Sequence, residues 1–122
     1  MDYTNYAKVM KAMSEPKRVK ILDLLSCGTL CACDVLNHFD FTQPTLSHHI
    51  KVLVEAELVT AERKGTWHYY SIKKDSVEQL LSDTKILFSS DKHCICVTEE
   101  NQKKDNQHIE LLEENDEKEY IK

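Results

Sequence analysis

An amphipathic helix followed at once by two β-prone runs is the feature that most constrains the fold of this 122-residue chain. Between Thr42 and Ala56, apolar side chains recur at helical spacing, and small polar and basic side chains share the opposite face. Residues 58–63 and 67–72 are β-prone, and they flank the basic tip Lys64-Gly65-Thr66. The sequence therefore predicts a helix that packs by one face, followed directly by a β-hairpin.

The residues before Thr42 carry three further helical patterns. The first covers residues 3–13, and the second begins after Ser14, a good N-cap, with Pro16 at an early helical position. The apolar stripe expected on the second helix consists of Val19, Leu22 and Leu25. Thr29 is expected to cap a short third helix that runs to Asn37, and a last helix is predicted over residues 75–89.

These elements together predict a mainly α protein with a small β-hairpin. Two helices joined by a few residues, the second of which exposes polar groups, meet the requirements of a helix-turn-helix. A hairpin directly after that motif makes a winged helix-turn-helix, here with about five helices plus the wing. We expect residues 1–97 to form this domain and residues 98–122 to form an acidic, disordered tail.

The charge is divided unevenly along the chain, whose net charge is -5. Residues 1–90 hold 11 Lys and Arg against 11 Asp and Glu, whereas residues 91–122 hold 5 against 10. The domain itself is therefore neutral and can bind DNA through a local basic face. No signal-peptide layout and no apolar run of roughly 20 residues is present, which predicts a cytoplasmic protein.

The polar face of the helix after Thr42 provides the candidate DNA contacts. His49 projects near the apolar edge and is not expected to contact DNA, unlike its neighbour His48. On the hairpin, Arg63 and Lys64 can meet phosphates or the minor groove. The residues predicted to contact DNA are Gln43, Thr45, Ser47, His48, Lys51, Arg63 and Lys64.

Five cysteines, an odd number, are more typical of free thiols or metal ligands than of a disulfide framework in a reducing compartment. Cys31 and Cys33 form a C-x-C just before the predicted helix-turn-helix, and Cys94 and Cys96 form a second one. Thiolates select soft ions, so the first pair favours trivalent arsenic or antimony, followed by cadmium, lead and zinc. The alternative interpretation is that Cys31 and Cys33 are small buried side chains with no role in metal binding.

The chain resembles the ArsR/SmtB family of winged-helix metal-sensing repressors, and within it the arsenic-responsive branch. The resemblance covers about residues 5–97 and is carried by three motifs: Leu30-Cys31-Ala32-Cys33-Asp34, residues 43–53 and Gly65-Thr66-Trp67-His68-Tyr69-Tyr70. It implies a homodimer that binds an inverted-repeat operator in double-stranded DNA when metal-free and releases it on binding its ion. The dimer interface is then expected on residues 3–13 and 75–89.

The resemblance also narrows the choice of ion. Zinc sensors of the family place histidines and carboxylates on the last helix, yet residues 75–89 contain no His. Its cadmium and lead sensors add a cysteine near the amino terminus, yet residues 1–26 contain no Cys. We therefore expect arsenite as the inducer of an arsenic-resistance operon, with antimonite as the second candidate inducer and no constitutive cofactor.

The third ligand stays open, because many arsenic sensors carry a cysteine where this chain has Leu36. The candidates are Cys27, a non-protein ligand such as hydroxide or a small thiol, and the distal Cys94 and Cys96. Residues i and i+2 of a helix point to opposite sides, so we expect ion binding to unwind the turn that holds Cys31 and Cys33. That distortion would lower DNA affinity through the neighbouring helix.

Three alternatives remain at this point. The first is a winged-helix repressor that senses cadmium, lead or zinc. The second is a small thiol-based enzyme that handles arsenic, which the missing C-x₅-R and C-x-x-C motifs disfavour, so that we expect no enzyme. The third is a metal buffer, which would not need a helix-turn-helix and a wing.

Overall fold

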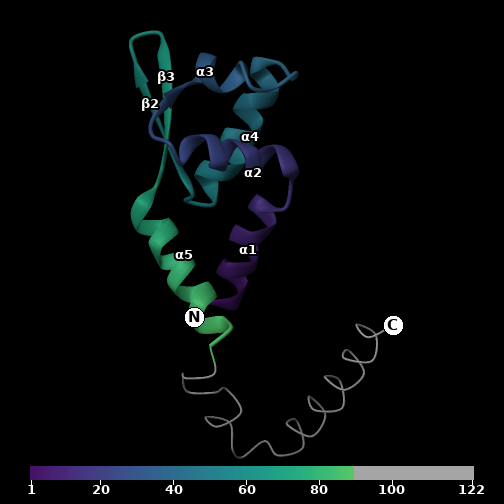
Figure 1. Ribbon diagram of the computed structural model, residues 1–122, viewed down its shortest axis with the longest axis vertical. Coiled ribbons are helices and arrows are strands. Elements are labelled where there is room, and N and C mark those ends of the chain that lie inside the picture. Colours follow the sequence, from purple (N-terminus) through teal and green to yellow (C-terminus); the bar gives the residue numbers. More distant parts are fainter. Residues whose placement is uncertain (90–122) are drawn as a thin grey trace, which may run out of the picture. The chain divides into compact units, whose positions relative to one another are not determined.

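The computed structural model describes residues 1–89, so the predictions for Cys94, Cys96 and the tail at 98–122 lie outside the described residues. The chain divides into two units, Met1–Lys85 and Ile86–Lys122. Five helices and three strands follow one another in the order α1 (Tyr3–Met13), α2 (Pro16–Leu25), β1 (Leu30–Cys31), α3 (Ala32–Leu36), α4 (Gln43–Glu55), β2 (Val59–Lys64), β3 (Trp67–Ile72) and α5 (Lys74–Leu87), as Figure 1 shows. The predicted winged helix-turn-helix is confirmed.

The sheet is antiparallel and has the order β1-β3-β2. The β2–β3 hairpin is the predicted wing, and it turns at Gly65, whose φ of 64° suits glycine. The short strand β1 was not predicted, and it pairs Leu30 with Tyr70 and Cys31 with Tyr69. It ties the segment before α3 to the wing.

The junction of α1 and α2 differs from the prediction. Ser14 does not cap α2; it ends α1, where its hydroxyl donates to the Lys11 carbonyl at 2.7 Å. Glu15 is the N-cap of α2, and its carboxylate accepts from the backbone N–H groups of Lys17 at 2.9 Å and Arg18 at 3.3 Å. A carboxylate at this end also complements the helix dipole.

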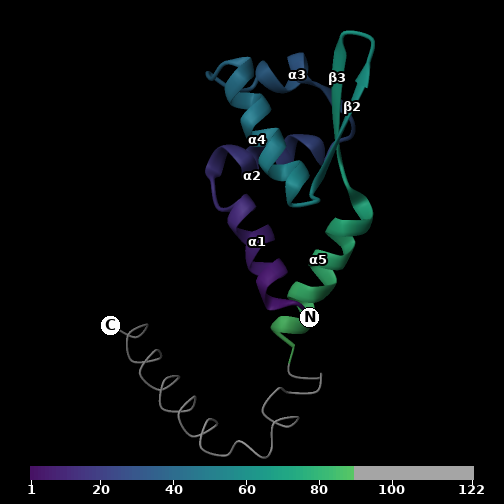
Figure 2. The same ribbon diagram turned by 180° about the vertical axis from the view of Figure 1, so that it is seen from behind.

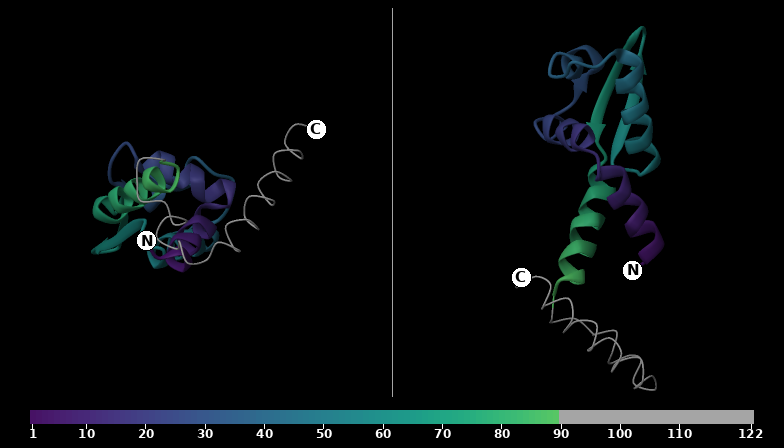
Figure 3. Two further views of the ribbon diagram at one scale, coloured as in Figure 1. Left: turned by 90° about the horizontal axis from the view of Figure 1, so that it is seen from below. Right: turned by 90° about the vertical axis from the view of Figure 1, so that its right-hand side faces the viewer.

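The core lies where α2, α3 and α4 meet the sheet. Figure 2 shows α2 and α4 on the same side of the β2–β3 hairpin, and the right-hand view of Figure 3 looks past these two helices toward its strands. Its fully buried side chains are Ile21, Leu25, Val35, Leu46, Leu53 and Val59. The stripe predicted for α2 is wrong at Val19, which is 48% exposed, because the buried pair Ile21 and Leu25 sets the inward face. Among residues 1–89, no helix is long and apolar enough to cross a membrane.

Candidate metal centre and nucleic-acid interface

The two cysteines of the first C-x-C lie at the junction of β1 and α3. Cys31 ends β1 and is the N-cap of α3, and its sulfur accepts from the backbone N–H of Asp34 at 3.4 Å. Cys33 is the second residue of α3, and the structure joins its sulfur to that of Cys31 in a disulfide, with 5.4 Å between the two Cα atoms. The pair is therefore not held as two free thiols in this structure.

The predicted placement of this pair in one helical turn is wrong, and Thr29 is not the cap of α3. Cys31 has extended backbone angles, φ -77° and ψ 159°, so its side chain is not fixed to the helical direction. Its sulfur reaches the sulfur of Cys33 without any unwinding of α3. A helix distortion is therefore not needed to bring the two sulfurs together.

A carboxylate completes this cluster. Within residues 1–89, the one group of three potential metal ligands is Cys31, Cys33 and Asp34, whose ligand atoms all lie within 4.8 Å of one another. Cys27 is exposed and is not a member of this group. Two reduced sulfurs and a carboxylate oxygen suit a soft, thiophilic ion with room for one oxygen ligand. Asp34 follows the C-x-C directly and lies in the first turn of α3. It was not identified as a candidate ligand from the sequence, although its position next to Cys33 could have indicated this.

The cluster borders both elements of the predicted DNA interface. A cavity of about 190 Å³ is lined by Cys33 and Leu36 of α3, by Gln43 at the start of α4 and by Trp67 and His68 of the wing. An ion bound at Cys33 would therefore lie close to Gln43, the first residue of α4, and to Trp67 and His68 at the start of β3.

Helix α4 presents its polar face to solvent as predicted. Gln43, Ser47, His48 and Lys51 are exposed, and Thr45 is partly buried. The opposite face is buried and consists of Leu46, His49, Ile50 and Leu53. Thr42 is the N-cap, although its side chain makes no capping hydrogen bond. The exposed set is of the size and polarity that suit a helix in the major groove.

The wing carries its basic residues outward. Arg63 and Lys64 are both exposed at the end of β2. The Arg63 Nε donates to the Gly65 carbonyl at 3.0 Å, and the Lys64 Nζ lies 5.5 Å from the centre of the Tyr69 ring. These contacts orient two cations next to the turn without neutralising them.

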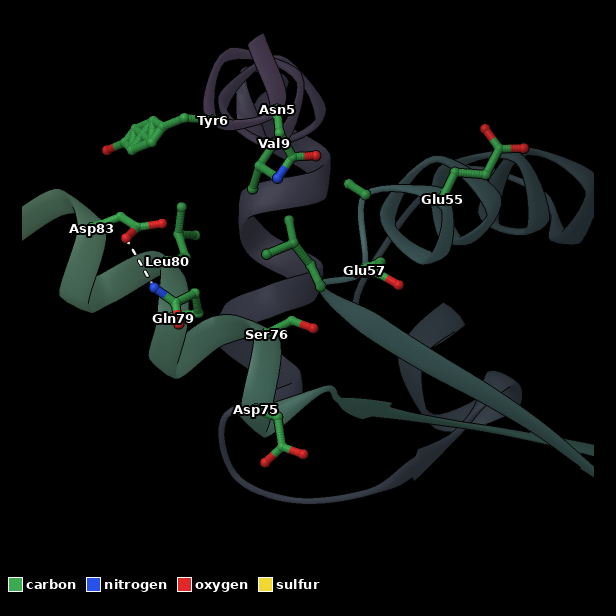
Figure 4. Close-up of a pocket in the computed structure, with 12 residues that line it drawn as sticks. Asn5, Tyr6, Val9, Glu55, Glu57, Asp75, Ser76, Gln79, Leu80 and Asp83 are labelled. Carbon is green, nitrogen blue, oxygen red and sulfur yellow. Dashed lines mark hydrogen bonds between the residues drawn. The ribbon is translucent and has the colours of Figure 1, made fainter. Parts of the chain in front are cut away.

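Helices α1 and α5 enclose a second cavity, of about 430 Å³, which Figure 4 shows. Tyr6 and Val9 of α1 line it opposite Leu80 and Asp83 of α5. The Tyr6 hydroxyl forms a hydrogen bond of 2.6 Å with the Thr84 hydroxyl. Helix α5 has no fully buried residue, and Leu81 is 63% exposed. These two helices therefore leave apolar surface uncovered.

Comparisons with known proteins agree with this architecture. Residues 15–61 match the profile of the arsR family of bacterial regulatory proteins. The chain is 47% identical over 96 residues to the arsenical resistance operon repressor of Staphylococcus xylosus, a match that covers 79% of this chain and 92% of that protein.

Two solved structures extend the comparison to the fold. A possible transcriptional regulator for arsenical resistance matches with a TM-score of 0.62 and 26% identity, over 68% of this chain and 86% of that one. The homodimeric winged helix-turn-helix DNA-binding domain of Mycobacterium bovis matches with a TM-score of 0.58 and 27% identity, over 75% of this chain and 85% of that one. These relatives are described as regulators of transcription, which removes the enzyme interpretation. The chain therefore belongs to the arsR family of bacterial regulatory proteins.

Proposed function

We propose that this protein is the repressor of an arsenical resistance operon, active as a homodimer in the cytoplasm. It binds an inverted-repeat operator when its thiol pair is free of metalloid and leaves the operator when trivalent arsenic binds Cys31 and Cys33. One observation carries the proposal: the two sulfurs meet at a junction that is attached to both the wing and α4. The 47% identity to an arsenical resistance operon repressor supports the choice of ion.

The binding step is a ligand exchange at reduced cysteines. Arsenous acid, As(OH)₃, reacts with two thiols to form two As–S bonds and releases two molecules of water, so that one hydroxyl stays on arsenic. The Asp34 carboxylate lies within 4.8 Å of both sulfurs and can accept a hydrogen bond from that hydroxyl. This favours a non-protein third ligand, hydroxide or a small thiol. Antimonite, a larger ion with the same preference for sulfur, is the second candidate inducer.

The DNA contacts follow from exposure and charge. Gln43, Thr45, Ser47, His48 and Lys51 face the major groove in this proposal, and Arg63 and Lys64 meet the backbone or the minor groove beside it. The two α4 helices of a dimer read the two halves of the operator. The dimer forms through α1 and α5, whose apolar side chains Tyr3 and Leu81 are 62% and 63% exposed in the single chain.

When arsenic binds both sulfurs, it cross-links Cys31, the last residue of β1, to Cys33 in the first turn of α3. Release follows if this cross-link shifts β1, which is paired with the wing, or α3, which contacts α4. A coupling of about 1–3 kcal/mol is enough to weaken operator binding about 5–150-fold.

Fluorescence anisotropy on an inverted-repeat DNA from the upstream region of the gene tests the proposal. We expect specific binding by the reduced protein that arsenite reverses and zinc does not. Cys31→Ser and Cys33→Ser proteins should bind the DNA and ignore arsenite, whereas the matched control Cys27→Ser should respond like the wild type. Release by cadmium, lead or zinc but not by arsenite would identify a different sensor, and loss of the response in Cys27→Ser would make Cys27 the third ligand.

A further inference from the structure

One polar side chain is buried on the inner face of helix α4. His49 is 8% exposed, directly beside His48, the candidate DNA contact. Its ring lies 5.5 Å from that of Phe41 and 5.8 Å from that of His48, measured between ring centres. A buried imidazole on the helix that reads DNA needs a hydrogen-bond partner, and it has one in α2.

That partner is Arg18, a residue of α2 whose side chain contacts α1 and α4. Its Nη1 lies 3.2 Å from the Nδ1 of His49 in α4, and its Nε donates to the Ala12 carbonyl near the end of α1 at 2.6 Å. Its own backbone N–H is held by the Glu15 carboxylate that caps α2. One side chain thus fixes α4 relative to both α1 and α2.

The chemistry of this hydrogen bond fixes the charge of His49. An arginine guanidinium only donates, so the Nδ1 of His49 must accept, and the ring is neutral with its proton on Nε2. Burial is the largest influence on His49 and lowers its pKa, and the charges of Arg18, His48 and Lys17 lower it further. The Glu15 carboxylate acts in the opposite direction. Lys8 and Lys11 of α1 and Glu55 of α4 line the neighbouring cavity with Arg18 and His48, so on this side of α4 the basic side chains outnumber the one carboxylate.

We propose that the Arg18–His49 hydrogen bond positions helix α4 for DNA binding and that protonation of His49 breaks it, so that operator affinity falls on acidification. A protonated Nδ1 cannot accept from Arg18, and it would place two cations 3.2 Å apart in a partly buried position. His49 is a positioning residue in this scheme, since its own ring faces away from the exposed surface of α4. The inference rests on the proposed function, because operator binding is its readout.

The test measures operator affinity by anisotropy at pH 7.5 and pH 5.5 at one salt concentration. His49→Asn places an amide oxygen near the position of Nδ1, which accepts from Arg18 but does not titrate. His49→Leu removes the acceptor, and His38→Asn, at an exposed histidine outside α4, is the control. We expect the wild type to lose affinity for the operator between pH 7.5 and pH 5.5, because the protonated fraction of His49 grows as the pH falls. His49→Asn should lose most of this difference, His49→Leu should bind weakly at both values, and His38→Asn should show the same fall as the wild type.

The same fall in wild type and His49→Asn would overturn the proposal. A second measurement needs neither DNA nor a variant: two-dimensional ¹H–¹⁵N NMR of the imidazole nitrogens in the full chain. A proton on Nε2 at neutral pH supports the hydrogen bond, and a proton on Nδ1 overturns it. Failure of the wild type to bind any operator at pH 7.5 would instead overturn the proposed function, and the NMR result would still decide whether the hydrogen bond exists.

Discussion

Cys31 stands directly opposite Tyr69 in the antiparallel pairing of β1 with β3. The Tyr69 ring in turn lies under the Lys64 Nζ at 5.5 Å, so one short path of contacts leads from the thiol pair to the basic end of the wing. The neighbouring pair, Leu30 and Tyr70, anchors this path in the core, because Tyr70 is only 5% exposed. The proposed metalloid ligands are thus connected to the wing by backbone pairing as well as to α4 through α3.

This connection predicts that arsenite changes the wing itself. When arsenite is added to the reduced protein, we expect faster amide hydrogen exchange in β3 around Tyr69 and Tyr70, together with a change in α3, because displacement of β1 weakens its hydrogen bonds to β3. Exchange followed by mass spectrometry measures this. The Cys31→Ser, Cys33→Ser double variant serves as the control and should show no change. An effect confined to α3 and α4 would show that the wing takes no part in the response.

The state of the thiol pair gives a second prediction. In the structure the two sulfurs are bonded to each other, and a disulfide offers no thiolate to arsenic. The protein oxidised by a disulfide reagent should therefore bind operator DNA without responding to arsenite, and treatment with a phosphine reductant should restore the response. Anisotropy on both forms measures this, and Cys27→Ser should behave in the same way. An oxidised protein that still releases DNA with arsenite would place the metalloid site elsewhere.

The sequence predicts α4 and the wing well because their patterns are long. Thirteen residues of helical spacing fix the buried face of α4, and the two six-residue strands of the wing lie within one residue of their predicted bounds. The first turn of α3 was placed wrongly for a physical reason. Thr29 is a better intrinsic N-cap than Cys31, but pairing of β1 with β3 holds Cys31 extended and starts the helix after it.

At the candidate site, too, contacts between distant residues could not be predicted from local sequence patterns. The C-x-C could be predicted as a soft-metal motif from its position before the helix-turn-helix, whereas the approach of its two sulfurs depends on a two-residue strand that is too short to show a period. The Arg18–His49 hydrogen bond joins residues 31 positions apart, and no local pattern reports it. Local propensity likewise favoured Ser14 over Glu15 as the cap of α2, although the longer side chain reaches two N–H groups.

Two valines provide a matched test of the core. Val35 of α3 is fully buried, and Val19 of α2 is 48% exposed. Val35→Ala should lower the free energy of unfolding by about 2 kcal/mol, because it removes two buried carbon atoms and leaves a cavity. Val19→Ala should change it by less than about 0.5 kcal/mol. Urea unfolding at one fixed protein concentration measures both free energies. Equal losses in the two variants would show that Val19 is buried, as the stripe predicted from the sequence requires.

His49 also predicts how the stability of the fold depends on pH. Burial lowers its pKa below the ordinary value of 6.5, so the unfolded chain takes up a proton at a higher pH than the folded chain does. The stability that depends on neutral His49 is therefore fully present above about pH 6.5 and is lost as the pH falls through the pKa of the folded state. Urea unfolding of the wild type at pH 7.5, 6.5 and 5.5 should show a fall in the free energy of unfolding that His49→Asn largely removes. The matched control is His38→Asn, because His38 is exposed and should leave the fall unchanged. If the free energy of unfolding falls equally in wild type and His49→Asn, then carboxylates and not the buried imidazole control the acid sensitivity of the fold.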